Sequence, residues 1–139
     1  MADHSVLIDT SYWIEYFNRP GTPKAGEVER LIRNDRAALV GVVLAELLQG
    51  ARNEKELSEL RIALGAVTWI KTTGEVYVRA GRLGFEMRRL GVTVPVTDCI
   101  IAASAETVGG HVLTLDVHFE QLARVASLDL RGLDESHPG

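Results

Sequence analysis

Short apolar runs alternate with longer segments of helical periodicity, and this alternation constrains the fold more than any other feature of the chain. The first run, Val6–Ile8, is apolar at every position, as expected of a central parallel strand buried on both faces. Further strands are predicted at Ala37–Val40, Val67–Ile70, His111–Leu115 and Ala126–Leu130. Helices are predicted at Ser11–Phe17, Lys24–Asn34, Val42–Ala51, Glu54–Leu64, about Thr73 to Leu90, Thr97–Val108 and Val117–Arg124. This order predicts an α/β domain over residues 1–130 with a central, mostly parallel sheet, followed by a polar tail over 131–139.

Composition and charge narrow the class of protein. The 139 residues suffice for one domain with one sizeable core. Fifteen Lys and Arg against nineteen Asp and Glu give a net charge of −4, unlike the usual basic surface of a nucleic-acid-binding protein. Cys99 is the only cysteine, so no intrachain disulfide is expected, and no apolar segment approaches the ~18 residues of a membrane helix. We therefore expect a cytoplasmic protein that does not enter a membrane.

Two of the predicted strands lead into an acid. Val6–Ile8 runs into Asp9, and the apolar run of Val112 to Leu115 runs into Asp116. Ligands of open α/β sheets bind outside the carboxyl ends of the strands, so both acids are expected at the ligand-binding edge. The simpler alternative is that each Asp caps the helix that follows it.

Asp98 and Glu46 extend this set of acids. Asp98 opens a helix, where the helix dipole alone favours a carboxylate, yet the next residues are apolar and predict burial. Glu46 lies at the edge of an apolar helical stripe and points either into solvent or into a cleft. Carboxylates that converge repel one another, and a divalent cation removes the conflict. Oxygen ligands suit Mg²⁺ or Mn²⁺, which can bind a phosphate and lower the pKa of water. The acids together predict hydrolysis of phosphodiester bonds.

Four stretches carry a resemblance to a known family: VLIDTSYW, AELLQGA, PVTDCIIAASA and LTLDVHF. In type, order and spacing they resemble the PIN domain, in particular the VapC toxins of bacterial toxin–antitoxin pairs, over nearly the whole chain. The resemblance implies a three-layer α/β/α sandwich and a Mg²⁺- or Mn²⁺-dependent endoribonuclease. It also implies a homodimer that a VapB-type antitoxin neutralises by binding near the helices around Glu46. The implied catalytic and metal-binding residues are Asp9, Glu46, Asp98 and Asp116, with support from Thr10 or Ser11 and from Thr114.

His118 departs from the pattern of the family. Many relatives carry a further acid two residues after the last Asp, whereas this chain has D-V-H-F. His118 could bind Mn²⁺ better than Mg²⁺, contact a phosphate when protonated, or cover the core beside Phe119. The substitution leaves open whether one or two ions bind.

Two other groups of residues have several interpretations. Arg79, Arg82 and Arg89 share one face of a predicted helix, which we interpret as a solvated face rather than an RNA-binding one. The aromatic cluster Tyr12, Trp13, Tyr16 and Phe17 could stack on unpaired bases, but burial under an antitoxin helix or in the core explains it better.

Two rival functions remain. A phospho-acceptor receiver domain also has acids at strand ends, but it needs an acidic pair after the first strand and a late Lys. Here DTS follows the first strand and no Lys follows Lys71. A catalytically inactive PIN-like module that binds RNA or protein is the second alternative, and the four acids favour an active nuclease over it.

Overall fold

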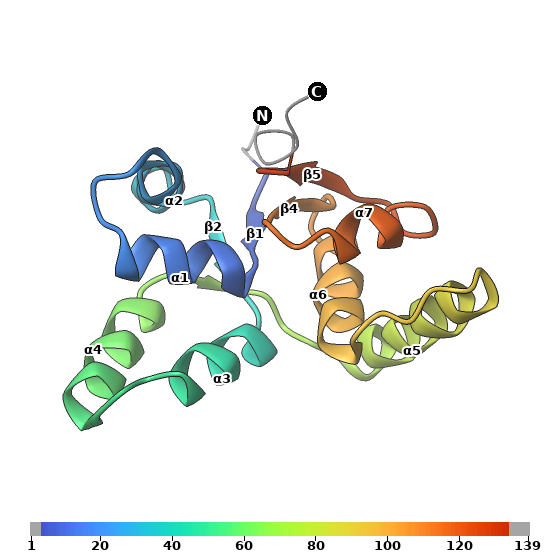
Figure 1. Cartoon of the computed structure of the whole chain (residues 1–139), viewed down its shortest axis with the longest axis horizontal. Helices are drawn as coiled ribbons and strands as arrows, with labels where there is room; N and C mark the ends of the chain where they lie inside the picture. The colour runs from blue at the N-terminus through green and yellow to red at the C-terminus, as the bar shows by residue number, and fades with distance from the viewer. Residues whose placement is uncertain (1–3, 134–139) are drawn as a thin grey trace.

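The computed structural model describes residues 4–133, which form a five-stranded sheet flanked by helices (Figure 1). All strand pairs are parallel, and the order across the sheet is β3-β2-β1-β4-β5. The strands are β1 (Val6–Ile8), β2 (Ala37–Leu39), β3 (Thr68–Trp69), β4 (His111–Leu113) and β5 (Asp129–Arg131). In the centre, Leu7 pairs with Ala38 on one side and with Val112 on the other. The predicted parallel sheet is thereby confirmed.

The helices form two groups with the sheet between them. Those from α1 to α4 gather on the side of β2 and β3, and those from α5 to α7 gather on the side of β4 and β5 (Figure 1). Their bounds are α1 Thr10–Asn18, α2 Pro23–Arg33, α3 Gly41–Gln49, α4 Glu54–Gly65, α5 Gly74–Arg89, α6 Val96–Glu106 and α7 His118–Leu122. Within residues 4–133, none of these helices is long and apolar enough to cross a membrane.

Four of the five strands are shorter than predicted: β2 ends one residue earlier, β3 lacks one residue at each end, and both C-terminal strands differ as well. β4 ends at Leu113 rather than Leu115, and β5 begins at Asp129 rather than Ala126. Leu115 and Ala126 are apolar because they pack against the core from loops, not because they belong to the sheet. β5 ends at Arg131, inside the predicted polar tail, and residues 134–139 of that tail lie outside the described residues.

The central strand pair and α6 position the residues of interest. β1 is buried at all three residues and lies next to β4, so the segments after both strands emerge at the same edge of the sheet. α6 packs against β1, β4 and α3. Its small residues, Ala102, Ala103 and Ala105, are all buried and let the helix lie close to the sheet. The first turn of α6 is therefore held near the ends of β1 and β4.

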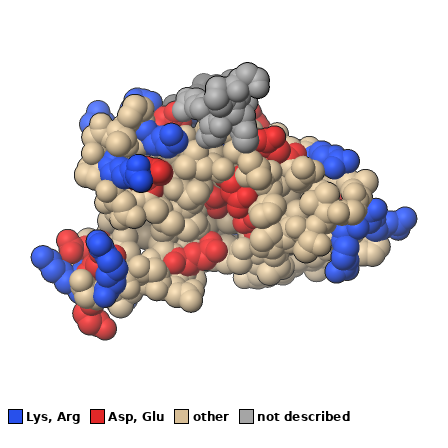
Figure 2. Space-filling view, in the orientation of Figure 1, with Lys and Arg blue, Asp and Glu red and all other residues tan. Residues whose placement is uncertain are grey.

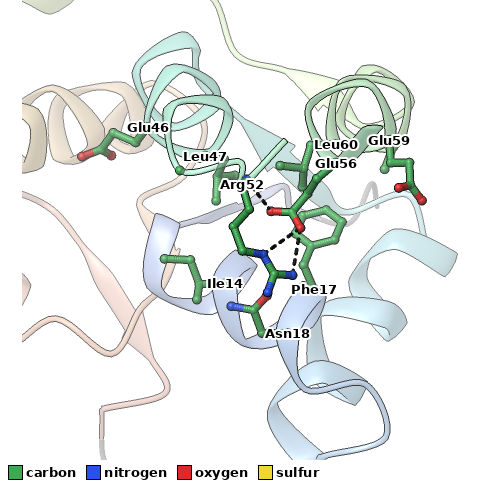
Figure 3. Close-up of a pocket in the computed structure, with 11 residues that line it drawn as sticks. Ile14, Phe17, Asn18, Glu46, Leu47, Arg52, Glu56, Glu59 and Leu60 are labelled. Atoms are coloured by element: carbon green, nitrogen blue, oxygen red, sulfur yellow. Dashed lines mark hydrogen bonds and ion pairs between the residues drawn. The ribbon is translucent and has the colours of Figure 1, made fainter. Parts of the chain in front are cut away.

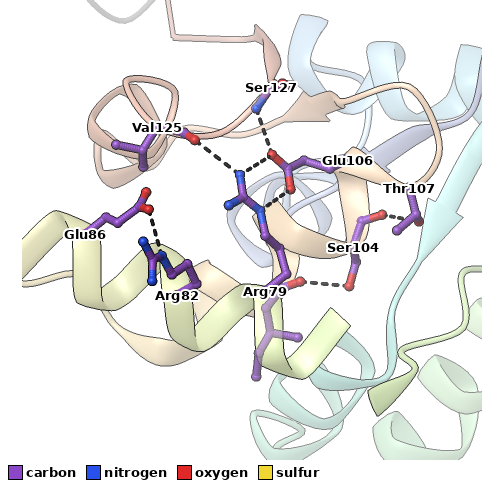
Figure 4. Close-up of polar contacts among 9 residues, drawn as sticks. Arg79, Arg82, Glu86, Ser104, Glu106, Thr107, Val125 and Ser127 are labelled. Atoms are coloured by element: carbon purple, nitrogen blue, oxygen red, sulfur yellow. Dashed lines mark hydrogen bonds and ion pairs between the residues drawn. The ribbon is translucent and has the colours of Figure 1, made fainter. Parts of the chain in front are cut away.

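Arg79 lies in an ion-pair network rather than on the solvated face predicted for it (Figure 4). Its guanidinium donates to both carboxylate oxygens of Glu106, at 2.9 and 3.0 Å, and to the carbonyl oxygen of Val125 at 3.2 Å. Glu106 also accepts from the backbone N–H of Ser127 at 2.9 Å. The hydrogen bond from Arg79 lowers the pKa of Glu106 below its ordinary value. The network connects α5, α6 and the loop after α7.

The other two arginines of α5 remain on an exposed face, as predicted. Arg82 pairs with Glu86 one turn further along the helix, at 2.9 Å. Both Arg82 and Arg89 lie over the ring of Phe85, at 5.6 and 5.8 Å from its centroid. Both guanidinium groups therefore interact with residues of their own helix.

Candidate active site

Acidic side chains gather between the two groups of helices. Figure 2 shows Asp and Glu near the middle of this face, whereas Lys and Arg lie toward its periphery. The elements that meet in this region are the ends of β1 and β4, the first turn of α6 and helix α3.

Asp9 is buried at the end of β1, with 5% of its surface exposed. Its Oδ2 accepts hydrogen bonds from Ser11 Oγ and Thr114 Oγ1, each at 2.9 Å. Within the described chain, its side chain does not cap α1, so the capping alternative is wrong for Asp9. Burial raises the pKa of the Asp9 carboxyl, and the two hydroxyls act in the opposite direction. Asp9 is thus a buried carboxylate held in one orientation.

The two hydroxyls that contact Asp9 also fix the loop after β4. Thr114 Oγ1 accepts from the backbone N–H of Asp116 at 2.9 Å, and Ser11 Oγ accepts from that of Leu115 at 3.0 Å. Each hydroxyl therefore donates to the carboxylate and accepts from the loop. The loop that carries Asp116 is tied to Asp9 through Ser11 and Thr114.

Asp98 points into the same region from the first turn of α6 and is 7% exposed. Its Oδ2 is buried and has no hydrogen-bond partner among the residues that the structure describes. Burial raises the pKa of Asp98 to about 7, the negative charges of Asp116 and Asp9 add to this rise, and His118 opposes it. Such a carboxyl needs a cation nearby to remain ionised at neutral pH.

Asp116 and His118 complete a compact group with Asp98. Asp116 Oδ1 accepts from the backbone N–H of His118 at 2.9 Å, so it also supports the start of α7. The side-chain Nδ1 of His118 lies 3.0 Å from Asp116 Oδ1 and 3.3 Å from Asp98 Oδ2. One ligand atom from each residue falls within 4.8 Å of the other two, which is a spacing that can hold a metal ion. The side chain of His118 faces the two acids, while Phe119 fills the core.

Glu46 lies beside this group and is connected to it through Thr10. Its Oε1 accepts from Thr10 Oγ1 at 2.8 Å, and Thr10 directly follows Asp9 in the chain. Neither Glu46 nor Asp9 belongs to the three-residue group of possible ligands found within the described residues. The structure therefore brings Asp98 and Asp116 together, with Asp9 near enough for its charge to act on Asp98 and with Glu46 connected through Thr10.

A groove lies next to Glu46, near the helices where the family resemblance implied antitoxin binding (Figure 3). It has a volume of about 660 Å³ and lies between α1, α3 and α4. Its apolar lining consists of Ile14, Phe17, Leu47, Leu60 and Ala63. Arg52 lies across the groove and pairs with Glu56 at 2.9 and 3.1 Å. The apolar stripe of α4 is visible in the sequence, but nothing local in the sequence indicates that it faces α1.

The aromatic cluster of α1 divides between the core and this groove. Tyr12 and Trp13 are fully buried, and Tyr16 and Phe17 are partly buried against the core. Phe17 also lines the groove. Core packing therefore explains most of the cluster.

A known family, several curated proteins and several solved structures resemble this chain. The chain matches the family model of the PIN domain over residues 6–125. It is 32% identical to VapC ribonuclease Mb1587 of Mycobacterium bovis and to ribonuclease VapC11 of Mycobacterium tuberculosis, over 88% of this chain and 95% of each relative. Among solved structures it resembles VapBC2 from Rickettsia felis bound to a promoter DNA fragment, with a TM-score of 0.76 and 23% identity over 91% of this chain and 96% of that one. VapBC-1 from nontypeable Haemophilus influenzae gives a TM-score of 0.73 at 22% identity, over 91% of this chain and 96% of that chain.

Proposed function

The chain belongs to the PIN-domain family, as a relative of the VapC ribonucleases, and from this premise we propose that it is an endoribonuclease toxin controlled by an antitoxin. The observation that carries the proposal is the convergence of Asp9, Asp98 and Asp116 from three separate elements. Three acids whose charges act on one another are electrostatically unfavourable, and stability alone gives no reason to keep them in one region. Their arrangement is explained if they bind a cation.

The donor set fits a divalent cation such as Mg²⁺ or Mn²⁺. Carboxylate oxygens are the preferred ligands of both ions, and the unpartnered, buried Oδ2 of Asp98 faces the space between Asp116 and His118. Asp98, Asp116 and Asp9 would hold the ion. When bound, it would offset the negative charge of a phosphodiester and lower the pKa of a coordinated water.

The remaining residues orient this centre. Ser11 and Thr114 hold Asp9 in place and fix the loop of Asp116, so the acids are positioned before RNA binds. Thr10 holds Glu46 at the edge of the centre, where its carboxylate would orient the attacking water. Asp9 and Asp98 are buried, and charges act most strongly in such surroundings, where little water screens them.

The groove beside Glu46 would receive the antitoxin. An apolar lining on α1, α3 and α4 suits the apolar face of a partner helix or extended segment. Because Glu46 lines the same groove, a bound segment would reach the acidic centre directly. Solved relatives such as VapBC2 from Rickettsia felis are toxin–antitoxin complexes, which supports a partner of this kind.

Cleavage of RNA by purified variants tests the nuclease. With Mg²⁺ or Mn²⁺, we expect the wild-type protein to cut single-stranded RNA of mixed sequence. The products should carry terminal phosphate monoesters rather than 2′,3′-cyclic phosphates. Asp9→Asn and Asp98→Asn should each lower the rate roughly 100-fold or more, as expected when an electrostatic element is removed from an active site. Asp35→Asn makes the same chemical change at an exposed turn with a positive φ of 56° and should keep full activity.

Three results would contradict the proposed nuclease. Unchanged cleavage by the folded Asp9→Asn and Asp98→Asn variants, or unchanged wild-type cleavage in excess EDTA, would contradict a metal-dependent centre at these acids. Absence of cleavage by the wild type on every RNA tested would favour an inactive binding module.

A further inference from the structure

His118 adds a nitrogen atom to a group of ligands that is otherwise made of oxygens. Its Nδ1 approaches Asp116 Oδ1 and Asp98 Oδ2, at 3.0 and 3.3 Å, yet among the described residues it forms a hydrogen bond with neither. Three polar atoms thus face one another without the alignment that a hydrogen bond requires. An ion between them would give Asp98 Oδ2 and His118 Nδ1 the partner that each lacks among the described residues, while Asp116 Oδ1 also accepts from the backbone N–H of His118.

The position of His118 is fixed by its surroundings. Its backbone N–H donates to Asp116 Oδ1, and its imidazole Nδ1 lies 3.0 Å from the same oxygen. The next residue, Phe119, is fully buried and anchors the start of α7 in the core. The imidazole is 60% buried, against acids that come from another helix and from the preceding loop. This is the arrangement expected of a ligand, because the side chain would lose little freedom on binding an ion.

We propose that His118 binds the divalent cation of this centre through Nδ1 and shifts its preference from Mg²⁺ toward Mn²⁺. This proposal rests on the function proposed above. Mg²⁺ strongly favours oxygen ligands in a near-ideal octahedron, whereas first-row transition ions accept imidazole nitrogen. Mn²⁺ accepts the carboxylates and water as well, so it suits a mixed site.

The identity of the ligand can be measured without any RNA cleavage. Pulsed electron paramagnetic resonance of the Mn²⁺-loaded protein detects a nitrogen nucleus bound to the ion. We expect a ¹⁴N coupling in the wild-type protein and in His4→Ala, an exposed histidine outside the site. The coupling should be lost in His118→Asp and His118→Asn, of which the first restores an all-oxygen site.

Calorimetric titration with Mn²⁺ and Mg²⁺ tests the preference. We expect the ratio of Mn²⁺ to Mg²⁺ affinity to fall about tenfold or more in His118→Asp, within the range by which partners of a metal site affect binding. Comparison of the melting temperatures of all variants would verify that they are folded.

The outcomes separate this proposal from the function on which it rests. Mn²⁺ bound to the wild type without a ¹⁴N coupling, and with an unchanged affinity ratio in both variants, would overturn the role of His118 while leaving the acidic centre intact. Failure of the wild type to bind either ion would overturn both.

Discussion

At the scale of single residues, the surroundings of Asp9 and Asp98 explain the shifts of their pKa values. Asp9 is buried but receives two hydroxyl hydrogen bonds, whereas Asp98 is buried with an unpartnered oxygen and the charges of two neighbouring acids. This difference explains why the pKa of Asp98 reaches about 7. The sequence alone predicted both acids at the site. It could not show that Asp98 Oδ2 would lack a hydrogen-bond partner among the described residues.

The raised pKa of Asp98 makes the stability of the metal-free protein depend on pH. Between about pH 4 and pH 7 the unfolded chain has released this proton while the folded protein still holds it, so rising pH favours unfolding. The melting temperature in EDTA should therefore fall across this window because of Asp98. In Asp98→Asn this contribution is absent, so the melting temperature of the variant relative to wild type should increase with pH.

Differential scanning calorimetry from pH 4 to pH 7.5 shows whether the melting temperatures change with pH in the predicted direction. Saturating Mn²⁺ or Mg²⁺ should raise the melting temperature of the wild type most strongly at the upper end of this pH range, because the ions bind the deprotonated carboxylates. A difference in melting temperature between Asp98→Asn and wild type that stays constant with pH would contradict the raised pKa of Asp98.

Thr114 is expected to matter for both stability and catalysis. Thr114→Val removes the hydrogen bond to Asp9 and the one from the backbone N–H of Asp116, in a side chain that is completely buried. We expect a loss of about 1–3 kcal/mol in the free energy of unfolding, as for buried polar groups left without partners. RNA cleavage should fall as well. Thr107→Val, at an exposed position, is the matched control, and equal effects of the two changes would argue against this role of Thr114.

At the scale of helices and strands, local patterns predicted most elements and failed where tertiary contacts decide. Thr73, near the predicted start of α5, caps the helix by accepting a hydrogen bond from the backbone N–H of Val76, and the buried residues Val76, Ala80, Leu83 and Met87 recur at helical spacing. The ends of β4 and β5 were misplaced because Leu115 and Ala126 owe their apolar character to packing from loops. The partner of Arg79 is 27 positions away, on α6, and no local pattern identifies it.

The Arg79 network should stabilise the contact between α5 and α6 without affecting the site. Arg79 is 38% exposed, so Arg79→Met is expected to cost only about 1 kcal/mol in the free energy of unfolding. The equivalent change in Arg82, whose pair with Glu86 is within one exposed helix, should cost less. Denaturant titrations measure both, and a larger effect for Arg82→Met would contradict the ranking. Divalent-ion affinity should be unchanged in both variants.

At the scale of the whole molecule, the fold places the acidic centre next to an apolar groove. The pairing of β1 with β4 brings Asp9 and Asp116 to one edge, and this could be predicted from the rule that strand ends bind ligands. The groove depends on how α1, α3 and α4 approach one another, which the sequence did not reveal. Nuclease and partner binding should accordingly be separable by mutation.

Ile14→Asp tests this separation. Ile14 lines the groove with 46% of its surface exposed, so a charge there should weaken antitoxin binding with little effect on folding. We expect Ile14→Asp to keep its RNA cleavage but to resist inhibition by the small protein encoded beside it. Ile62→Asp, an exposed position outside the groove lining, should remain inhibited. Inhibition of Ile14→Asp at wild-type concentrations of that protein would place the partner elsewhere.

The most direct test of the central claim is the anomalous scattering of Mn²⁺ in crystals of the protein soaked with the ion. We predict a peak at coordination distance from the carboxylates of Asp98 and Asp116, beside Asp9, which is absent from crystals of Asp98→Asn. A protein that cuts RNA but shows its Mn²⁺ peak away from these carboxylates, or keeps the same peak in Asp98→Asn, would contradict the account.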